Sequence, residues 1–216
     1  MNCIVTAGPT YEKMDNVRRL TNFSTGRLGT ELANYLTARG HDVTLLIGEQ
    51  ATFAGPRQVN RVETFTTTTD LRDWLQAQAG AKVGAIFHAA AVSDFMFGKI
   101  WLRPAQGEMT EVKSGKISTR QGTLLAELVP TPKILSGLRD WFPQTQIVGW
   151  KYEVDGDRAT VIAASARQLH ECLTDACVAN GAAYGEGFGL VTPNGKCVHL
   201  ADAAALFETL EASILR

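Results

Sequence analysis

Two stretches decide the fold: residues 3–10, CIVTAGPT, and residues 22–29, NFSTGRLG. The first is a short apolar strand that ends at a glycine, and the second opens an amphipathic helix expected from Gly26 to about Ala38. Both glycine segments therefore lie where a strand gives way to a helix, the edge at which α/β proteins bind phosphorylated ligands. Glycine lets the backbone approach a phosphate, and free N–H groups at a helix N-terminus attract the anion. This pattern predicts an α/β fold with an anion site near its first strand.

Strands and helices alternate over most of the chain. This rhythm is typical of a doubly wound, mainly parallel sheet with right-handed crossovers, and we expect a single domain over residues 1–216. We expect strands at Cys3–Thr6, Val43–Ile47, Val62–Phe65, Val83–His88, Gln146–Trp150 and Ala176–Ala179. Further helices are expected from an N-cap at Asp70, from Pro132 to about Trp141, over Arg158–Leu173 and over Ala201–Ile214, with a type I′ hairpin turn at 192–195.

The alternation stops between Val92 and Val129, where no helical period is present. A hairpin is predicted from residues 111 to 119 around Ser114-Gly115, followed by an extended run at Leu124–Val129. A long excursion in a compact domain is usually functional, so this one is interpreted as a flap or a subunit contact. Its basic residues could reach a triphosphate or could be solvated edge charges: Lys113, Lys116 and Arg120.

Composition excludes several classes of protein. The net charge is −1 and no block of Lys and Arg occurs, which argues against a nucleic-acid partner. No apolar run approaches the roughly 20 residues that span a bilayer, and the N-terminus begins a strand without the layout of a signal peptide. The four cysteines form neither a CxxC pair nor a zinc-ligand spacing, so we expect reduced thiols, a cytoplasmic protein and no metal site.

Each candidate site has a plainer interpretation. The run from Ser24 to Gly29 is either a phosphate-binding helix start or an ordinary N-cap with a glycine for close packing. The run Ala89–Phe95 either lets a ligand lie against the backbone, with Asp94 accepting hydrogen bonds, or only packs and caps a turn. His88 and His170 either titrate near neutrality or are structural.

A short-chain dehydrogenase is the obvious alternative for a chain with this N-terminal sequence. Those enzymes need a Tyr with a Lys four residues later, which lowers the pKa of the tyrosine, and none of the four tyrosines has one. In those enzymes an acidic residue at the end of the second strand binds the adenine ribose. Here the second strand ends in Ile47-Gly48, although Glu49 is close. Hydride transfer is therefore disfavoured.

Taken together, these segments resemble the phosphopantothenate–cysteine ligases. They occur in the order of that family at close to its spacing over about residues 2–180. The matching segments are Val5–Thr10, Val17–Gly29, Ala89–Phe95, Lys116–Ser118, Thr131–Leu135, Val148–Lys151 and Val178–Asn180.

The resemblance implies a Rossmann-like domain that acts as a homodimer with shared active sites in coenzyme A biosynthesis. Such ligases activate the carboxylate of 4′-phosphopantothenate with a nucleoside triphosphate, release pyrophosphate, and let the amine of cysteine displace the nucleotide. It also implies Mg²⁺ carried by the nucleotide phosphates rather than by a protein cage. The chain resembles the stand-alone form of the family, for which no flavin is expected.

The resemblance also implies roles for individual residues. The expected nucleotide contacts are Gly8, Ser24, Gly26, Gly29, Trp150 and Asn180. The expected contacts to the acyl substrate are Asn22, Ala90, Ala91 and Asp94, with Arg18 reaching in from the other subunit. Asn22, Arg18 and the flap lysine, Lys116, are the expected catalytic residues, since they can donate to or pair with developing negative charge.

The chain departs from the family in two places. The helix before Val178–Asn180 has no lysine over Ala166–Cys172, where members that use CTP carry lysines, and Trp150 stands where Phe is usual. The choice between ATP and CTP is therefore open. Two alternatives also stay open: an NAD(P)-binding oxidoreductase and a nucleotide-binding relative that has lost catalysis.

Overall fold

The computed structural model describes residues 1–118 and 122–215. Its main sheet contains eight strands: β1 (Asn2–Ala7), β4 (Asp42–Gly48), β5 (Arg61–Phe65), β6 (Ala85–His88), β10 (Gln146–Tyr152), β11 (Ala176–Asn180), β12 (Phe188–Val191) and β13 (Cys197–Leu200). Five helices accompany it: α1 (Arg27–Ala38), α2 (Thr68–Ala77), α3 (Ile134–Trp141), α4 (Arg158–Cys172) and α5 (Ala203–Ile214). No helix in these described ranges is both long enough and apolar enough to cross a bilayer.

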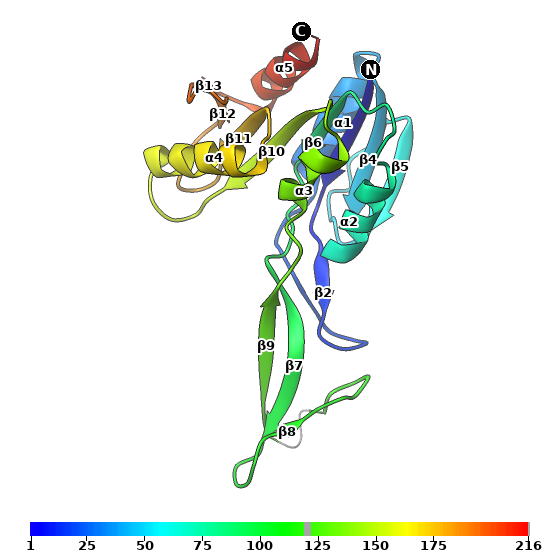
Figure 1. The fold of residues 1–216 in the computed structure, drawn as a ribbon, viewed down its shortest axis with the longest axis vertical. Coiled ribbons are helices and arrows are strands. Elements are labelled where there is room, and N and C mark those ends of the chain that lie inside the picture. Colours follow the sequence, from blue (N-terminus) through cyan, green and yellow to red (C-terminus); the bar gives the residue numbers. More distant parts are fainter. Residues whose placement is uncertain (119–121, 216) are drawn as a thin grey trace.

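The strand order across the sheet is β13-β12-β11-β10-β6-β1-β4-β5 (Figure 1). Neighbouring strands pair in parallel from β5 to β11, whereas β12 at one edge runs the opposite way and pairs antiparallel with both β11 and β13. The order runs outward in both directions from β1 and β6, as in a doubly wound Rossmann sheet. The predicted fold class is confirmed.

Along each central strand, successive side chains alternate between two separate hydrophobic cores, one on each face of the sheet. Cys3, Val5 and Ala7 of β1 pack in the cluster formed with α1 and α5, whereas Ile4 packs in the cluster formed with α2 and α3. Both faces of the strand are therefore buried, which explains its continuous apolar sequence. Helix α4 packs against α3 and covers β11 on that second face.

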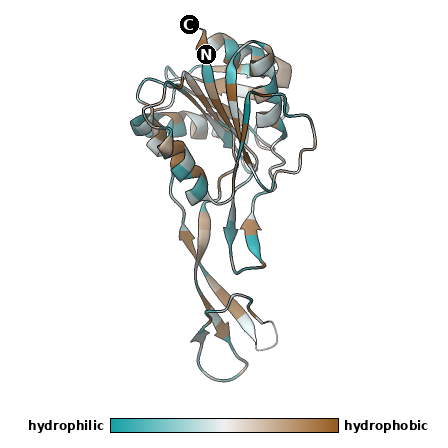
Figure 2. Cartoon of the chain, turned by 90° about the vertical axis from the view of Figure 1, so that its right-hand side faces the viewer, coloured by the Kyte–Doolittle hydropathy of each residue, from teal (hydrophilic) through white to brown (hydrophobic). Residues whose placement is uncertain are grey.

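The excursion after β6 forms a long arm that projects from the sheet (Figures 1 and 2). Strands β7 (Phe95–Arg103) and β9 (Thr123–Pro130) pair antiparallel along it, and β8 (Thr110–Glu111) adds to β7. A smaller hairpin of β2 (Tyr11–Lys13) and β3 (Arg19–Thr21) leaves the sheet on the same side.

The hairpin predicted at residues 111–119 is wrong. Segment 112–118 is a loop: after Val112, whose N–H donates to the Ile100 carbonyl of β7 at 2.8 Å, its backbone bonds run to the β2–β3 loop and to its own Ser114. The β-branched and aromatic residues of β7 pair with β9 instead. The predicted positions Thr119 and Arg120 lie outside the described residues.

Two helix starts also differ from expectation. Thr67, not Asp70, is the N-cap of α2: its side chain accepts from the Asp70 N–H at 3.1 Å, which leaves Asp70 in the first turn. Helix α3 starts at Ile134, after Pro132, because Thr131 is bonded to the backbone of Ser93 and Asp94 at the root of the arm and holds the chain extended there.

The β12–β13 hairpin is confirmed, but its turn is not type I′. A type I′ turn needs a positive φ at its second residue, and that residue is Pro193, whose ring fixes φ near −65°. The Gly195 N–H donates to the Thr192 carbonyl at 2.9 Å, and Gly195 takes the positive φ of 76°. This is the arrangement of a type I turn followed by a glycine bulge.

Candidate active site

The site begins where β1 and β6 lie side by side and the strand order diverges. The loop after β1 and the loop after β6 are joined by two backbone bonds, from Ala91 N–H to the Gly8 carbonyl at 2.9 Å and from Thr10 N–H to the Ala91 carbonyl at 3.1 Å. In open α/β sheets the crevice outside the carboxyl ends of the strands at this point is where ligands bind. Two of the predicted motifs, around Gly8 and around Ala90–Ala91, therefore meet at the expected place.

Three glycines bring the N-terminus of α1 onto the end of β1. Gly8 and Gly26 have φ of 77° and 80°, a region that favours glycine. At Gly29 an added Cβ would lie 2.7 Å from the Ala7 Cβ, so only a residue without a side chain allows this contact. Helix and strand backbones meet here without intervening side chains.

The start of α1 is not an ordinary capped end. Its N-cap is Gly26, which has no side chain to bond to the first turn, although the Thr25 hydroxyl just before the cap accepts from the Arg27 N–H at 3.3 Å. Helix N-termini leave N–H groups without intrahelical partners, and these attract anions. Neither Ser24 nor Thr25 is itself the N-cap, and phosphate binding at this helix start stays a prediction.

Asn22 connects this helix start to the loop after β6. Its Nδ2 donates to the Ala91 carbonyl at 3.0 Å, and the neighbouring Thr21 hydroxyl donates to the Thr10 carbonyl at 2.9 Å. The Ala90 N–H in turn donates to the Thr6 hydroxyl at 3.1 Å. Asn22, Ala90 and Ala91, three of the residues expected to contact the acyl substrate, are therefore close together and partly open to solvent.

Asp94 lies just beyond this group, at the root of the arm. Its carboxylate forms an ion pair with Lys133, and both side chains are mostly exposed. Lys133, the N-cap residue of α3, was not singled out from the sequence. Its place in the run Thr131–Leu135, which the resemblance had matched, was the only signal that could have found it.

His88 is buried beneath the same loops. Its Nδ1 bonds to the Thr6 hydroxyl at 3.0 Å, and burial lowers its pKa to about 4. The imidazole is therefore neutral at physiological pH and shares its partner, Thr6, with the Ala90 N–H. The structural interpretation of His88 is the one that the geometry supports.

Trp150 lies near the end of β10, and Asn180 is the last residue of the neighbouring strand β11. Strand alternation places both on the face that carries α1, with Val148 and Val178. Trp150 Nε1 and Asn180 Oδ1 are buried and have no hydrogen-bond partner among the described residues. An unsatisfied buried polar group costs about 1–3 kcal/mol, so a ligand that bonds to these two atoms would remove that cost.

His41 and Thr174 also carry buried polar atoms without a hydrogen-bond partner among the described residues, although His41 Nε2 lies 3.6 Å from the Glu211 carboxylate. They lie just before β4 and β11, however, and so at the opposite edge of the sheet. A hollow of about 460 Å³ lies at that edge, lined mainly by residues 80–84 and 141–145. Lys82 is the one charged side chain in its described lining, beside the polar side chains of Asn2, Gln144 and Thr145.

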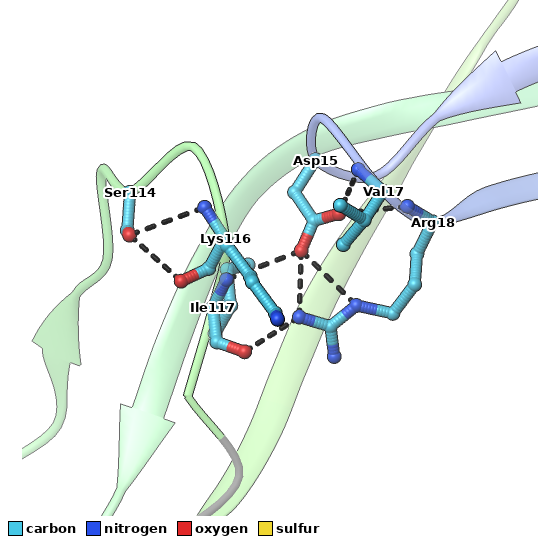
Figure 3. Close-up of polar contacts among 6 residues, drawn as sticks. All are labelled: Asp15, Val17, Arg18, Ser114, Lys116 and Ile117. Carbon is cyan, nitrogen blue, oxygen red and sulfur yellow. Dashed lines mark hydrogen bonds and ion pairs between the residues drawn. The ribbon is translucent and has the colours of Figure 1, made fainter.

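Arg18 and Lys116 lie together, but away from Asn22 of the same chain. The Asp15 carboxylate pairs with Arg18 at 2.6 Å, and Arg18 Nη2 donates to the carbonyl of Ile117, next to Lys116 (Figure 3). Arg18 is at the tip of the β2–β3 hairpin, and four extended residues place its Cα about 13 Å from that of Asn22. The structure therefore groups the expected catalytic residues into two separate sets.

No group of three or more His, Cys, Asp or Glu side chains suited to hold a metal ion occurs in the described part of the chain. All four cysteines are free thiols, and burial raises the pKa of Cys3 to about 11 and that of Cys177 to about 12. Neither thiol is ionised at neutral pH.

Comparison with known proteins agrees with this geometry. The chain is 33% identical over 178 residues to the coenzyme A biosynthesis bifunctional protein CoaBC of Thermococcus kodakarensis, a match that takes in 82% of this chain and 40% of that relative. The chain thus spans less than half the length of this relative.

Two solved structures share the fold. A DNA/pantothenate metabolism flavoprotein from Streptococcus pneumoniae superposes with a TM-score of 0.84 at 24% identity, over 100% of this chain and 98% of that one. A Cab2 H337A mutant solved as a complex with phosphopantothenate-cysteine superposes with a TM-score of 0.71 at 20% identity, over 99% of this chain and 85% of that one.

A family model matches nearly the whole chain. The match covers residues 1–210 and takes in the crevice, the arm and both antiparallel edge strands. This chain therefore belongs to the family of the DNA/pantothenate metabolism flavoprotein C-terminal domain.

Proposed function

We propose that this protein joins 4′-phosphopantothenate and cysteine through an acyl-nucleotide intermediate, a step of coenzyme A biosynthesis. The observation that carries the proposal is the bond from Asn22 to Ala91 at the switch point of the sheet, beside the N-terminus of α1, whose N-cap is Gly26. A relative named for coenzyme A biosynthesis and a related fold solved with phosphopantothenate-cysteine support the choice of substrates.

The first step activates the substrate carboxylate. A carboxylate oxygen attacks the α-phosphorus of the nucleotide, and pyrophosphate leaves. The glycine-lined turn at Gly8, Gly26 and Gly29 lets the phosphates approach the backbone and the N-terminus of α1. Ser24, half-buried just before this turn, is proposed to donate its hydroxyl to the same nucleotide.

The second step forms the amide. The cysteine amine attacks the acyl carbon, loses a proton, and displaces the nucleoside monophosphate. The Asn22 amide, which donates to the Ala91 carbonyl in the free protein, is proposed to donate also to the acyl oxygen without adding a competing charge, and Ala90, Ala91 and Asp94 are proposed to border the acyl chain. Catalysis on this proposal consists of positioning two reactants and stabilising the charge that develops between them.

Trp150 and Asn180 are proposed to bind the nucleotide base. The free donor Nε1 needs an acceptor and the free acceptor Oδ1 needs a donor, and adenine and cytosine each offer both. This complementarity fits ATP and CTP equally. Mg²⁺ is proposed to arrive on the nucleotide phosphates, in keeping with its preference for phosphate oxygens and water; no flavin takes part.

We further propose a homodimer with shared active sites. Apolar side chains that a monomer would leave in water gather on the arm and the β2–β3 hairpin: Val17, Leu20, Phe95, Met109 and Leu128, each at least 40% exposed. A second copy that covers them could receive Arg18, which lies about 13 Å from Asn22 of its own chain. The free thiols fit a cytoplasmic location.

The test is pyrophosphate release from ATP and from CTP with 4′-phosphopantothenate and cysteine, followed by mass detection of the amide. We expect release that needs both the acyl substrate and Mg²⁺, with amide formed in equal amount. Quenching of NADH fluorescence by the protein, with no pyrophosphate from either nucleotide, would instead support the oxidoreductase alternative. Nucleotide binding without release would support a relative that has lost catalysis.

A further inference from the structure

Asp15 is a buried carboxylate that holds two separate parts of the chain together. It lies in the β2–β3 loop with its side chain only 1% exposed. Its two oxygens accept five hydrogen bonds, from the backbone of Val17, Arg18 and Ile117 and from two nitrogens of the Arg18 guanidinium (Figure 3). Ile117 belongs to segment 112–118, which is remote in sequence and carries Lys116.

The two carboxylate oxygens of Asp15 accept hydrogen bonds from different groups. Oδ1 accepts from the N–H groups of Val17 and Arg18 at 2.9 and 2.8 Å and so shapes the turn. Oδ2 accepts from Arg18 Nε and Nη2 at 3.0 and 2.6 Å and from the Ile117 N–H at 3.2 Å. One oxygen thus organises the loop, and the other fixes Arg18 and attaches segment 112–118.

Two further bonds complete the attachment. The Asn16 N–H donates to the Gly115 carbonyl at 2.9 Å, and Arg18 Nη2 donates to the Ile117 carbonyl. We call this set of contacts, made by Asp15, Asn16 and Arg18 with the backbone of residues 115–117, the latch. Segment 112–118 is therefore held by one carboxylate and one guanidinium as well as by its own chain.

We infer that Asp15 is a positioning residue that presents Arg18 and Lys116 as one two-cation unit to an anionic group of the substrates, a phosphate or the activated carboxylate. This inference rests on the proposed function for the identity of the anion. It goes beyond that function by assigning a role to a residue that does not touch the substrate.

The charges on either side of the latch fit this role. Burial by itself raises the pKa of Asp15, but the N–H groups of Val17 and Ile117 and the Arg18 guanidinium outweigh it and hold the pKa well below its usual range. The carboxylate is therefore always ionised at neutral pH. It fixes the Nε and Nη2 side of Arg18, and Nη1 has no protein partner among the described residues.

Lys116 is oriented by the same loop. Its N–H and carbonyl both bond to the Ser114 hydroxyl, at 3.3 and 2.9 Å, while its exposed side chain extends toward the Arg18 guanidinium in Figure 3. Two cations near each other attract a multiply charged anion more strongly than either does alone. Without the latch, segment 112–118 would have to become ordered at each turnover, and the loss of its conformational entropy would cost free energy each time.

The test is the substitution Asp15→Asn, because it replaces one carboxylate oxygen by an NH₂ group and keeps the other oxygen. The amide oxygen can still accept from Val17 and Arg18, whereas an NH₂ group at the Oδ2 position cannot accept from Ile117 or from the guanidinium. Glu111→Gln is the matched control: Glu111 is on the same arm and pairs with Lys113 at 3.5 Å, outside the latch.

We expect Asp15→Asn to lower kcat about tenfold or more, with the KM for nucleotide changed less than about twofold, since only charge stabilisation is lost. Hydrogen exchange of residues 112–118 should become faster while exchange of β1 and β6 stays as in the unmodified protein. Adding Asp15→Asn to Lys116→Ala should lower kcat less than about twofold further, because the two act as a unit. Glu111→Gln should change none of these.

Wild-type kcat and wild-type exchange of residues 112–118 in Asp15→Asn would overturn the inference. Faster exchange throughout the sheet would also overturn it, because it would make Asp15 a general stability residue. If the unmodified protein forms no amide with either nucleotide, the proposed function fails, and the exchange experiment still decides whether Asp15 holds the segment.

Discussion

The side-chain amide of Asn22 and the carbonyl of Ala91 are joined by a hydrogen bond of 3.0 Å. This contact connects the loop that leads into α1 with the loop that follows β6, although the two residues are 69 positions apart. The proposed acyl group and nucleotide would meet beside this contact. Changes at Asn22 should therefore affect the chemical step first.

Asn22→Asp should lower turnover about 100-fold or more, because it replaces a donor by a like charge beside a carboxylate and the Ala91 carbonyl. Steady-state pyrophosphate release measures the effect. Asn34→Asp is the control: Asn34 Nδ2 also donates to a backbone carbonyl, that of Pro56 at 2.8 Å, but on the exposed side of α1. Turnover within twofold of the unmodified enzyme in Asn22→Asp would refute the assignment.

Trp150→Phe should weaken nucleotide binding five- to tenfold, about 1 kcal/mol, because it removes the buried Nε1 donor and keeps an aromatic ring. Isothermal titration with ATP and CTP gives the loss for each base. Trp141→Phe, at the opposite edge of the sheet, controls for the loss of ring volume. Equal affinities in Trp150→Phe and the unmodified protein would remove Trp150 from the base site.

Gly29→Ala should lower the free energy of unfolding by about 1–3 kcal/mol and weaken nucleotide binding. The new Cβ would lie 2.7 Å from the Ala7 Cβ and 3.1 Å from the Thr6 carbonyl oxygen, so α1 must move away from β1. In an unconstrained helix the same change stabilises by about 1 kcal/mol. The sign of the change in a urea titration is therefore decisive, and a gain in stability would contradict the close contact.

Stability should fall as the pH drops from 6.5 toward 4 because of His88. Its pKa is about 4 when buried and 6.5 in the unfolded chain, so over this range only the unfolded state takes up the proton. The contribution is fully present above pH 6.5, and about 2 kcal/mol of it is lost at pH 5. Asp15 and Asp157 have lowered pKa values, so their contributions are lost only at more acidic pH.

Urea titrations at pH 7.5 and pH 5 measure this difference. His88→Asn can still accept from the Thr6 hydroxyl but does not titrate, so its stability should change much less between the two pH values. An equal pH dependence in the two proteins would show that another group is responsible.

Subunit mixing tests the proposed dimer. Arg18→Ala mixed with Asn22→Ala should regain about a quarter of wild-type sites, since half of randomly formed dimers are mixed and each has one intact site. Lys116→Ala mixed with Asn22→Ala should behave in the same way, because the latch keeps Lys116 beside Arg18. Arg18→Ala mixed with Lys116→Ala should regain nothing, since every site would lack one cation.

Absence of recovery in the first two mixtures, after exchange of subunits is verified by mass, would place Arg18 and Asn22 in the site of one chain. Recovery in the third mixture would show that Arg18 and Lys116 serve different sites.

The central sheet could be predicted because its signals are local. Continuous apolar runs such as Val83–His88 belong to strands buried on both faces, and the glycines at 8, 26 and 29 mark where a backbone must come close. The helix faces followed from the spacing of apolar residues. These signals need no knowledge of what lies across the fold.

The arm and the latch could not be predicted in the same way. The pairing of β7 with β9 depends on a partner strand far along the chain, and β propensity is too weak to choose it over a hairpin at Ser114-Gly115. The role of Asp15 depends on Ile117, 102 residues away. The unsatisfied atoms of Trp150 and Asn180 likewise become visible only once burial is known.

The arm leaves the sheet and returns to it at almost the same point. Thr131 closes this neck, with its N–H on the Asp94 carbonyl and its hydroxyl on the Ser93 carbonyl, and Phe95 stands opposite Pro130. Because of this neck, the length of the arm has little effect on the crevice. Doubling the length of a closed loop costs only about 0.6 kcal/mol in loop-closure free energy. The sheet and its ligand crevice can therefore keep their geometry while the projecting strands vary in reach and in the surface that they offer.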